Sequence, residues 1–117
     1  MASTRPPPRL PLLVRRTLDA FVAGLRARFG SRLVSVTLFG SYARGEAHDE
    51  SDVDCLVLLD RVDREDDRAI TDLSADLTWQ IGGAVISPLI MSAAAFDAWK
   101  GRERRTPLEI EREGILL

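Results

Sequence analysis

Cysteine and histidine are almost absent from this sequence of 117 residues. The single cysteine, Cys55, excludes an internal disulfide bond and any zinc site built from cysteines. The single histidine, His48, leaves no basis for a multi-histidine metal site or a histidine-based catalytic triad. We expect His48 to be an ordinary solvated loop residue and Cys55 to be a buried, inert thiol.

Long apolar runs are also absent, so nothing approaches the length of a transmembrane helix. The N-terminus has arginines but no apolar signal core, and we therefore expect a cytoplasmic protein without a membrane partner. The net charge of −2 gives no electrostatic case for binding nucleic acid. A hydrophobic content of 45% suits a globular protein. We expect a flexible proline-rich tail over residues 1–11 and one domain over residues 12–117.

The hydrophobic periodicity predicts helices and strands in alternation. A small domain of the α/β (α+β) class is expected, with one mixed sheet of about three strands packed with helices. The predicted helices cover residues 12–29, the charged segment 60–67 through about Gln80, a short stretch capped by Ser92 that ends at Gly101, and a last segment that begins with a capping box at Thr106 and ends near Gly114. The predicted strands cover residues 33–39, 53–59 and 84–91.

Three residues refine this arrangement. The strand over residues 53–59 is apolar on both faces, which predicts a central strand covered on both sides. Pro88 cannot donate a ladder hydrogen bond, so the strand that contains it is expected at an edge or at a bulge. Trp79 falls opposite the apolar stripe of its helix. It either contacts a partner or packs where the helix ends, and the second interpretation is favoured.

The segment between the first two predicted strands contains the residues that indicate chemistry. Asp52 and Asp54 are two apart at the start of a strand, so their side chains share a face. Two adjacent carboxylates repel each other, and a hard cation such as Mg²⁺ removes the conflict. Gly40 and Ser41 follow the first strand, where backbone N–H groups can face a phosphate. A lone Asp-x-Asp would more often be a strand cap, but the combination favours a metal–nucleotide site.

This motif resembles the signature of the polymerase-beta-type nucleotidyltransferase superfamily, and within it the minimal nucleotidyltransferase (MNT) proteins. The resemblance rests on Gly40-Ser41-Tyr42-Ala43-Arg44-Gly45 and Ser51-Asp52-Val53-Asp54. It implies transfer of a nucleotidyl group, often AMP from ATP, to a hydroxyl. It also implies that Gly40 and Ser41 contact the β- and γ-phosphates, while Asp52 and Asp54 hold one or two Mg²⁺ ions.

The resemblance also directs attention to a residue that this chain lacks. Many relatives carry a third acidic residue on the next strand, which completes the metal site and helps to deprotonate the acceptor. The position where we expect that acid is Ser87, and the predicted strand contains no carboxylate. Whether Glu46 or Glu50 takes its place is left open by the sequence. We therefore expect slow transfer or none.

The MNT proteins are commonly paired with a small helical HEPN toxin, and in some pairs they adenylylate a tyrosine of that toxin. The resemblance thus implies an antitoxin, with a HEPN partner or a second copy completing the acceptor pocket. Two alternatives remain open. The chain could neutralise its partner by binding alone, or it could transfer nucleotides to a small molecule.

Overall fold

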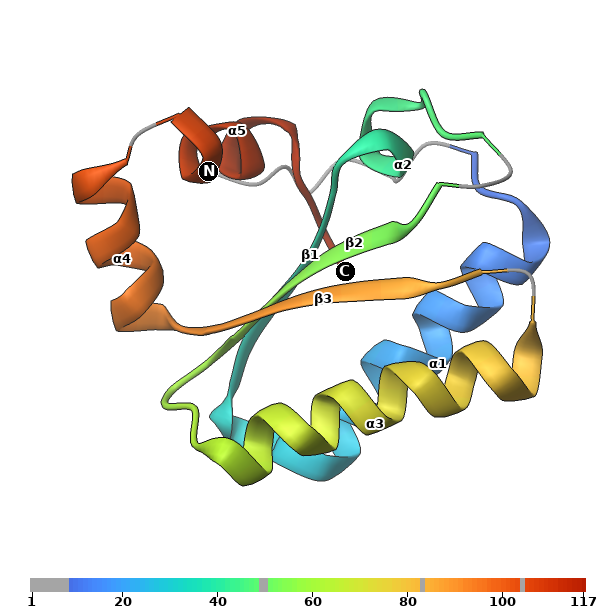
Figure 1. Ribbon diagram of the computed structural model, residues 1–117, viewed down its shortest axis with the longest axis horizontal. Helices are drawn as coiled ribbons and strands as arrows, with labels where there is room; N and C mark the ends of the chain where they lie inside the picture. The colour runs from blue at the N-terminus through green and yellow to red at the C-terminus, as the bar shows by residue number, and fades with distance from the viewer. Residues whose placement is uncertain (1–8, 49–50, 83, 104) are drawn as a thin grey trace.

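The computed structural model describes residues 9–48, 51–82, 84–103 and 105–117. A four-stranded mixed sheet lies at the centre, in the strand order β3-β2-β1-β4 (Figure 1). The strands are β1 (Leu33–Phe39), β2 (Val53–Leu59), β3 (Ile86–Ser92) and β4 (Ile115–Leu116). The helices are α1 (Leu12–Phe29), α2 (Ser41–Arg44), α3 (Arg64–Ile81), α4 (Ala93–Arg102) and α5 (Arg105–Glu113), with a 3-10 turn over Gly30–Arg32. The predicted α/β class is confirmed.

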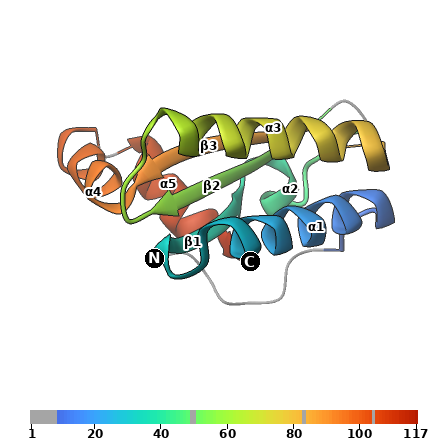
Figure 2. The same ribbon diagram turned by 90° about the horizontal axis from the view of Figure 1, so that it is seen from below.

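Apolar side chains form a core on each face of the sheet. The larger core lies under α1 and α3, which run side by side (Figures 1 and 2), and includes Phe21, Leu25 and Ile70. The smaller core lies under α4 and α5 and contains Phe96 and Ile110. β2 contributes to both cores because successive side chains point to opposite faces. The sheet is thus covered on both sides, as expected for a strand that is apolar throughout.

The predicted bounds of α1, β1 and β2 agree with the structure residue by residue. Cys55 is buried in β2, as expected. Pro88 lies in β3, which is an edge strand, as expected. The open side of an edge strand has no ladder hydrogen bonds that a proline could interrupt. Ser92 caps α4 by accepting a hydrogen bond from the Ala95 N–H.

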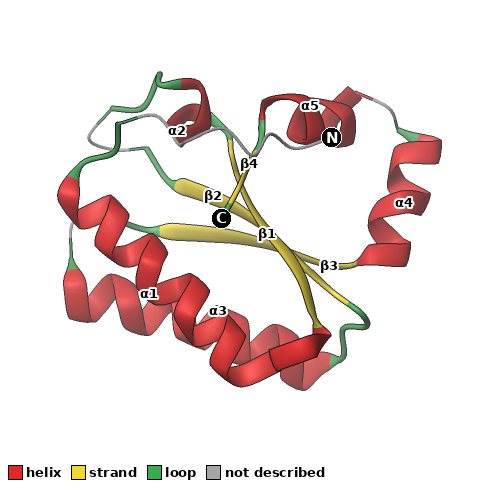
Figure 3. Cartoon of the chain, turned by 180° about the vertical axis from the view of Figure 1, so that it is seen from behind, coloured by secondary structure: helices red, strands yellow, loops and turns green. Residues whose placement is uncertain are grey.

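The sheet has four strands rather than about three. β4 is only two residues long and pairs antiparallel with Thr37 and Leu38 of β1 (Figure 3). Gly114 permits the turn from α5 into β4, because a Cβ there would overlap the Ile110 carbonyl oxygen and the Thr37 side chain. Such a short strand is defined by its partner, and its own sequence carries no period that could predict it.

Three further features differ from what the sequence predicts. The motif loop contains the short helix α2, where no helix was predicted. α5 already begins at Arg105, so Thr106 lies inside the helix and is not its cap. Trp79 is 90% exposed, which contradicts the interpretation that it packs where its helix ends. The predicted tail falls largely on residues 1–8, which lie outside the described residues.

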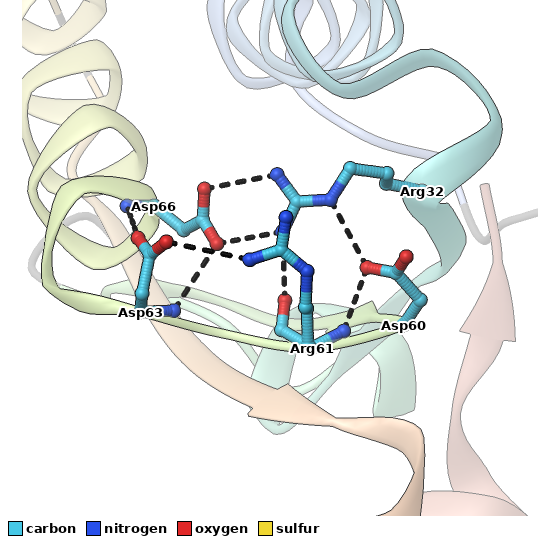
Figure 4. A network of polar contacts seen from close by, with 5 residues as sticks. All are labelled: Arg32, Asp60, Arg61, Asp63 and Asp66. Atoms are coloured by element: carbon cyan, nitrogen blue, oxygen red, sulfur yellow. Dashed lines mark hydrogen bonds and ion pairs between the residues drawn. The ribbon is translucent and has the colours of Figure 1, made fainter.

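A polar network fixes the start of α3 to the start of β1 (Figure 4). Asp63 caps α3 and forms a capping box with Asp66. Arg32 donates two hydrogen bonds to the carboxylate of Asp66, at 3.1 and 2.7 Å, and one to Asp60. The bond from Arg32 lowers the pKa of Asp66 to about 2. This network joins elements at the end of the sheet away from the motif loop and holds α3 in register with the strands.

Candidate functional site

The antiparallel pairing of β1 and β2 brings the two halves of the motif together. Phe39, the last residue of β1, is paired with Asp54 near the start of β2. Gly40 and Ser41 therefore leave β1 beside the point where Asp52 enters β2. Ten residues lie between Gly40 and Ser51 along the chain, but the strand ends meet at one edge of the sheet (Figure 1).

Gly40 lies directly against the Asp54 carboxylate. Its φ of 77° lies in a region that favours glycine, and a Cβ at this position would overlap the Oδ2 atom of Asp54 and lie 3.2 Å from its Cγ atom. Two independent constraints thus require glycine, one from the backbone and one from the neighbouring carboxylate. The backbone of the Gly-Ser segment and the carboxylate of Asp54 form one contiguous surface.

The two aspartates differ in their surroundings. Asp54 is half-buried, whereas Asp52 is exposed. Burial and then the charge of Asp52 raise the pKa of Asp54, while the nearby charge of Arg44 lowers it. A half-buried carboxylate whose ionised form is disfavoured by the charge of a neighbouring carboxylate forms, together with that neighbour, a donor set that a hard cation stabilises. The residues therefore fit a Mg²⁺ ion chemically.

Arg44 connects the motif with the last helix. Its guanidinium donates to Glu46 at 3.0 Å and to Glu113 of α5 at 3.5 Å. These carboxylates, Glu46 first, raise the pKa of Arg44, so it remains a cation beside Asp54. Between α2 and α5 lies a cleft of about 180 Å³, lined by Phe39, Gly40, Arg44, Thr106, Glu109, Ile110 and Glu113.

β3 provides no third carboxylate. It runs parallel to β2, and Ser87 is the register partner of Asp54. Ser87, the position where we expected an acid, thus lies next to Asp54 in register. Among the described residues, no group of three histidine, cysteine or acidic side chains could hold a metal ion. Glu46 is engaged by Arg44, and Glu50 lies outside the described residues.

The structure brings Gly40, Ser41, Asp52 and Asp54 to one edge of the sheet, with Ser41 as the half-buried first residue of α2. Sequence reasoning did not single out the bridge from Arg44 to Glu113. Arg44 lies within the motif and could have been considered, but Glu113 lies 69 residues further along the chain. Only the tertiary fold brings it to the site.

A family model for the nucleotidyltransferase domain matches residues 18–90, which include most of α1 and all of β1, the motif, β2 and α3. The chain belongs to the nucleotidyltransferase domain family. The region matched extends to β3 and leaves α4, α5 and β4 outside. The predicted family is thereby confirmed.

The relatives that this chain matches include two whose names state an activity. "Putative protein adenylyltransferase MJ1305" of Methanocaldococcus jannaschii is 36% identical over 84 residues, which are 68% of this chain and 55% of that protein. Protein adenylyltransferase MntA of Thermococcus cleftensis is 47% identical over 49 residues, 42% of this chain and 48% of that protein. The chain thus spans about half the length of these relatives.

Among solved structures, the chain is similar to one described as a toxin-antitoxin with AMP-PNP. The TM-score is 0.51 at 21% sequence identity, covering 82% of this chain and 68% of that one. This likeness shows the fold alone. Separately, no helix in the described part of this chain is both long and apolar enough to cross a bilayer.

Proposed function

We propose that this protein is a Mg²⁺-dependent protein adenylyltransferase that moves AMP from ATP to a hydroxyl. The contact of Gly40 with the Asp54 carboxylate, next to Asp52, is the observation that carries the proposal. It supports the proposal because the Gly-Ser backbone, which would bind a phosphate, and the carboxylate pair, which would bind the metal, lie on one surface. The names of the two relatives support protein as the acceptor class.

The roles proposed for the residues are those that the resemblance to the nucleotidyltransferases implies. Asp52 and Asp54 would hold one or two Mg²⁺ ions, which when bound neutralise the triphosphate and stabilise charge at the attacked phosphorus. Gly40 and Ser41 would position the β- and γ-phosphates through backbone N–H groups. Because the family chemistry depends mainly on position and charge, few further side chains are required.

We further propose that the biological role is that of an antitoxin, with a tyrosine of a helical HEPN toxin as the acceptor. The likeness to a toxin-antitoxin structure with AMP-PNP supports a paired partner and a nucleotide substrate. The resemblance of the motif to the MNT proteins supports the helical partner. A toxin hydroxyl that carries AMP would be blocked in its own chemistry.

A second candidate function is neutralisation of the partner by binding alone. Ser87 beside Asp54 favours it, because a serine is neither a good Mg²⁺ ligand nor a base at neutral pH. In that case the nucleotide site would be a relic or would bind nucleotide without transferring it. Only the transferase function adds the mass of AMP to the partner protein, so a mass measurement distinguishes the two functions.

The deciding experiment uses the proposed partner, the protein encoded by the gene next to that of this chain. Its intact mass is measured after incubation with this protein, ATP and Mg²⁺. We expect one added AMP, and its loss in the double variant Asp52→Asn, Asp54→Asn. The matched control is Glu65→Gln, Asp67→Asn, which removes two exposed carboxylates from the far end of the sheet with the same change in charge. This control should transfer AMP like the wild type.

Two other results lead to other conclusions. A stable complex without added mass, and equal neutralisation by the Asp52/Asp54 double variant, establishes the binding function. Equal transfer by the double variant would show that the two aspartates do not hold the catalytic metal, and it would refute the proposed site.

A further inference from the structure

The outer face of α3 carries a tryptophan that the fold does not use. α3 packs against the sheet through Ile70, Ser74 and Leu77. Trp79 lies two residues after Leu77, about 200° around the helix, and therefore points away from the core. It is 90% exposed, the highest exposure among the exposed large hydrophobic side chains. A bare tryptophan is the residue type most enriched among energetic anchors of protein interfaces.

Two arginines and then two aspartates recur every four residues along the same stripe of α3, with the exposed Glu65 beside them. Arg64 and Arg68 occupy its N-terminal half, and Asp72 and Asp76 follow at the same spacing of four residues. Each like-charged pair is unfavourable within a single helix. None of the four side chains forms an ion pair with another residue in the described part of the chain. Arg68 and Asp72 stand at the same spacing with opposite charges, so within one copy the two like-charged pairs are compensated only in part.

A shallow groove lies at the opposite end of α3 from Trp79. It has a volume of about 760 Å³ and is lined by Val62, Asp63, Arg64, Asp67, Arg68, Thr71 and Asp72. Val62 is the apolar residue among these, and the two arginines can stack on an aromatic face. The helix thus has a projecting aromatic side chain at its C-terminal end and a receiving groove at its N-terminal end.

We infer that a second copy of this chain docks on this face, with the two α3 helices antiparallel about a two-fold axis. In that arrangement, Arg64 and Arg68 of each copy lie opposite Asp76 and Asp72 of the other. Trp79 of each copy reaches the other's groove. A two-fold contact requires one surface to be complementary to itself. The α3 surface is complementary to itself in two ways. The arginine pair matches the aspartate pair in charge, and Trp79 matches the groove in shape.

The charge order favours a second copy over an unrelated partner. A cationic partner would be attracted by the aspartates but repelled by the arginines. An anionic partner would be attracted by the arginines but repelled by the aspartates. An antiparallel helix with the same block order pairs both halves at once, and a second copy of this chain supplies one. The contact lies on the sheet face opposite to α5, so the cleft beside Arg44 remains open in the dimer (Figure 2).

Sedimentation equilibrium of the full chain tests the inference. We expect a monomer–dimer equilibrium that shifts toward monomer as salt is added, because the contact is partly ionic. Trp79→Ala should weaken dimerisation by about tenfold or more. Its melting temperature at low concentration should match that of the wild type, because the side chain packs on nothing within its own copy. The control Trp99→Phe, in the small core, should leave the dimer intact.

Charge reversal gives the sharper result. Arg68→Glu alone and Asp72→Arg alone should each be monomeric, because each homodimer then has two repulsive pairs. An equimolar mixture of the two variants should form heterodimers, because both pairs are then attractive. A wild type that is monomeric at every concentration and salt level overturns the inference. Dimers of unchanged affinity in both single variants overturn it equally.

Discussion

The contact between Gly40 and Asp54 leads to a quantitative prediction. Gly40→Ala should destabilise the protein through two separate effects. Alanine at φ 77° and ψ −155° costs roughly 1–3 kcal/mol of backbone strain. Its Cβ would also overlap the Asp54 carboxylate, and relief of such overpacking costs typically about 1–3 kcal/mol. We therefore expect a total loss of about 2–6 kcal/mol.

Gly82 is a matched control for the first effect. It has φ 75° and ψ 165°, close to the conformation of Gly40, and nothing lies within 4 Å of the position of a Cβ. Gly82→Ala should therefore report backbone strain without overlap. The difference between the two variants isolates the contact with Asp54.

Removal of the Asp54 carboxylate gives a second, independent test of the overlap. In the Asp54→Ala background, Gly40→Ala should cost only as much as Gly82→Ala, because the Oδ2 and Cγ atoms are gone and the remaining Cβ atom is at an ordinary 3.4 Å. The double-mutant cycle should give a coupling of about 1–3 kcal/mol. Urea unfolding monitored by circular dichroism, in buffer with a metal chelator, measures all four proteins.

Asp54→Ala by itself should be more stable than the wild type at pH 7 without metal. Burial and Asp52 raise the pKa of Asp54, so the folded state holds its proton more tightly than the unfolded state does. Stability from this group is present at acidic pH and is lost as the pH rises through the raised pKa. Equal costs for Gly40→Ala and Gly82→Ala, with zero coupling in the cycle, would refute the role assigned to Asp54.

The remaining predictions concern Ser87, Asp66 and Cys55. Ser87→Asp should raise the rate of AMP transfer because it adds a carboxylate next to Asp54 in register; a rate equal to that of the wild type would show that a third acid is not limiting. The Arg32–Asp66 pair should contribute up to about 2 kcal/mol, because the pKa of Asp66 falls from 3.8 to about 2. That stability is present above pH 4 and is lost as the pH falls toward 2, so acid titration of unfolding should show a step that Asp66→Asn lacks. Burial raises the pKa of the Cys55 thiol to about 12, so a thiol reagent at pH 8 should react only at the rate of unfolding; rapid labelling of the native protein would contradict this.

Local patterns in the sequence are sufficient to predict α1, β1 and β2. Their apolar residues recur at the helical period or form short runs of Val and Leu, and glycines mark the ends. The placement of Cys55 in the core and of Pro88 at an edge also follows from single residues and their chemistry. Because these features depend on neighbours within a few residues, the sequence alone predicts them.

The motif predicted a family and a set of candidate residues, but it did not contain their arrangement. The overlap that forbids a side chain at Gly40 arises from Asp54, which is 14 residues away in sequence. The bridge from Arg44 to Glu113 joins residues that are even further apart. Such contacts depend on strand register, which the antiparallel pairing of β1 with β2 sets.

The sequence by itself determined the helices and strands with strong periodicity, the family, and the two carboxylates on one face. The tertiary structure decided the fourth strand, because two residues acquire strand geometry only from a partner such as β1. It also decided that Trp79 is exposed, because a helix pattern shows which side a residue takes but not whether another element covers that side. Local periodicity reports backbone conformation, whereas burial and contact depend on the packing of distant segments.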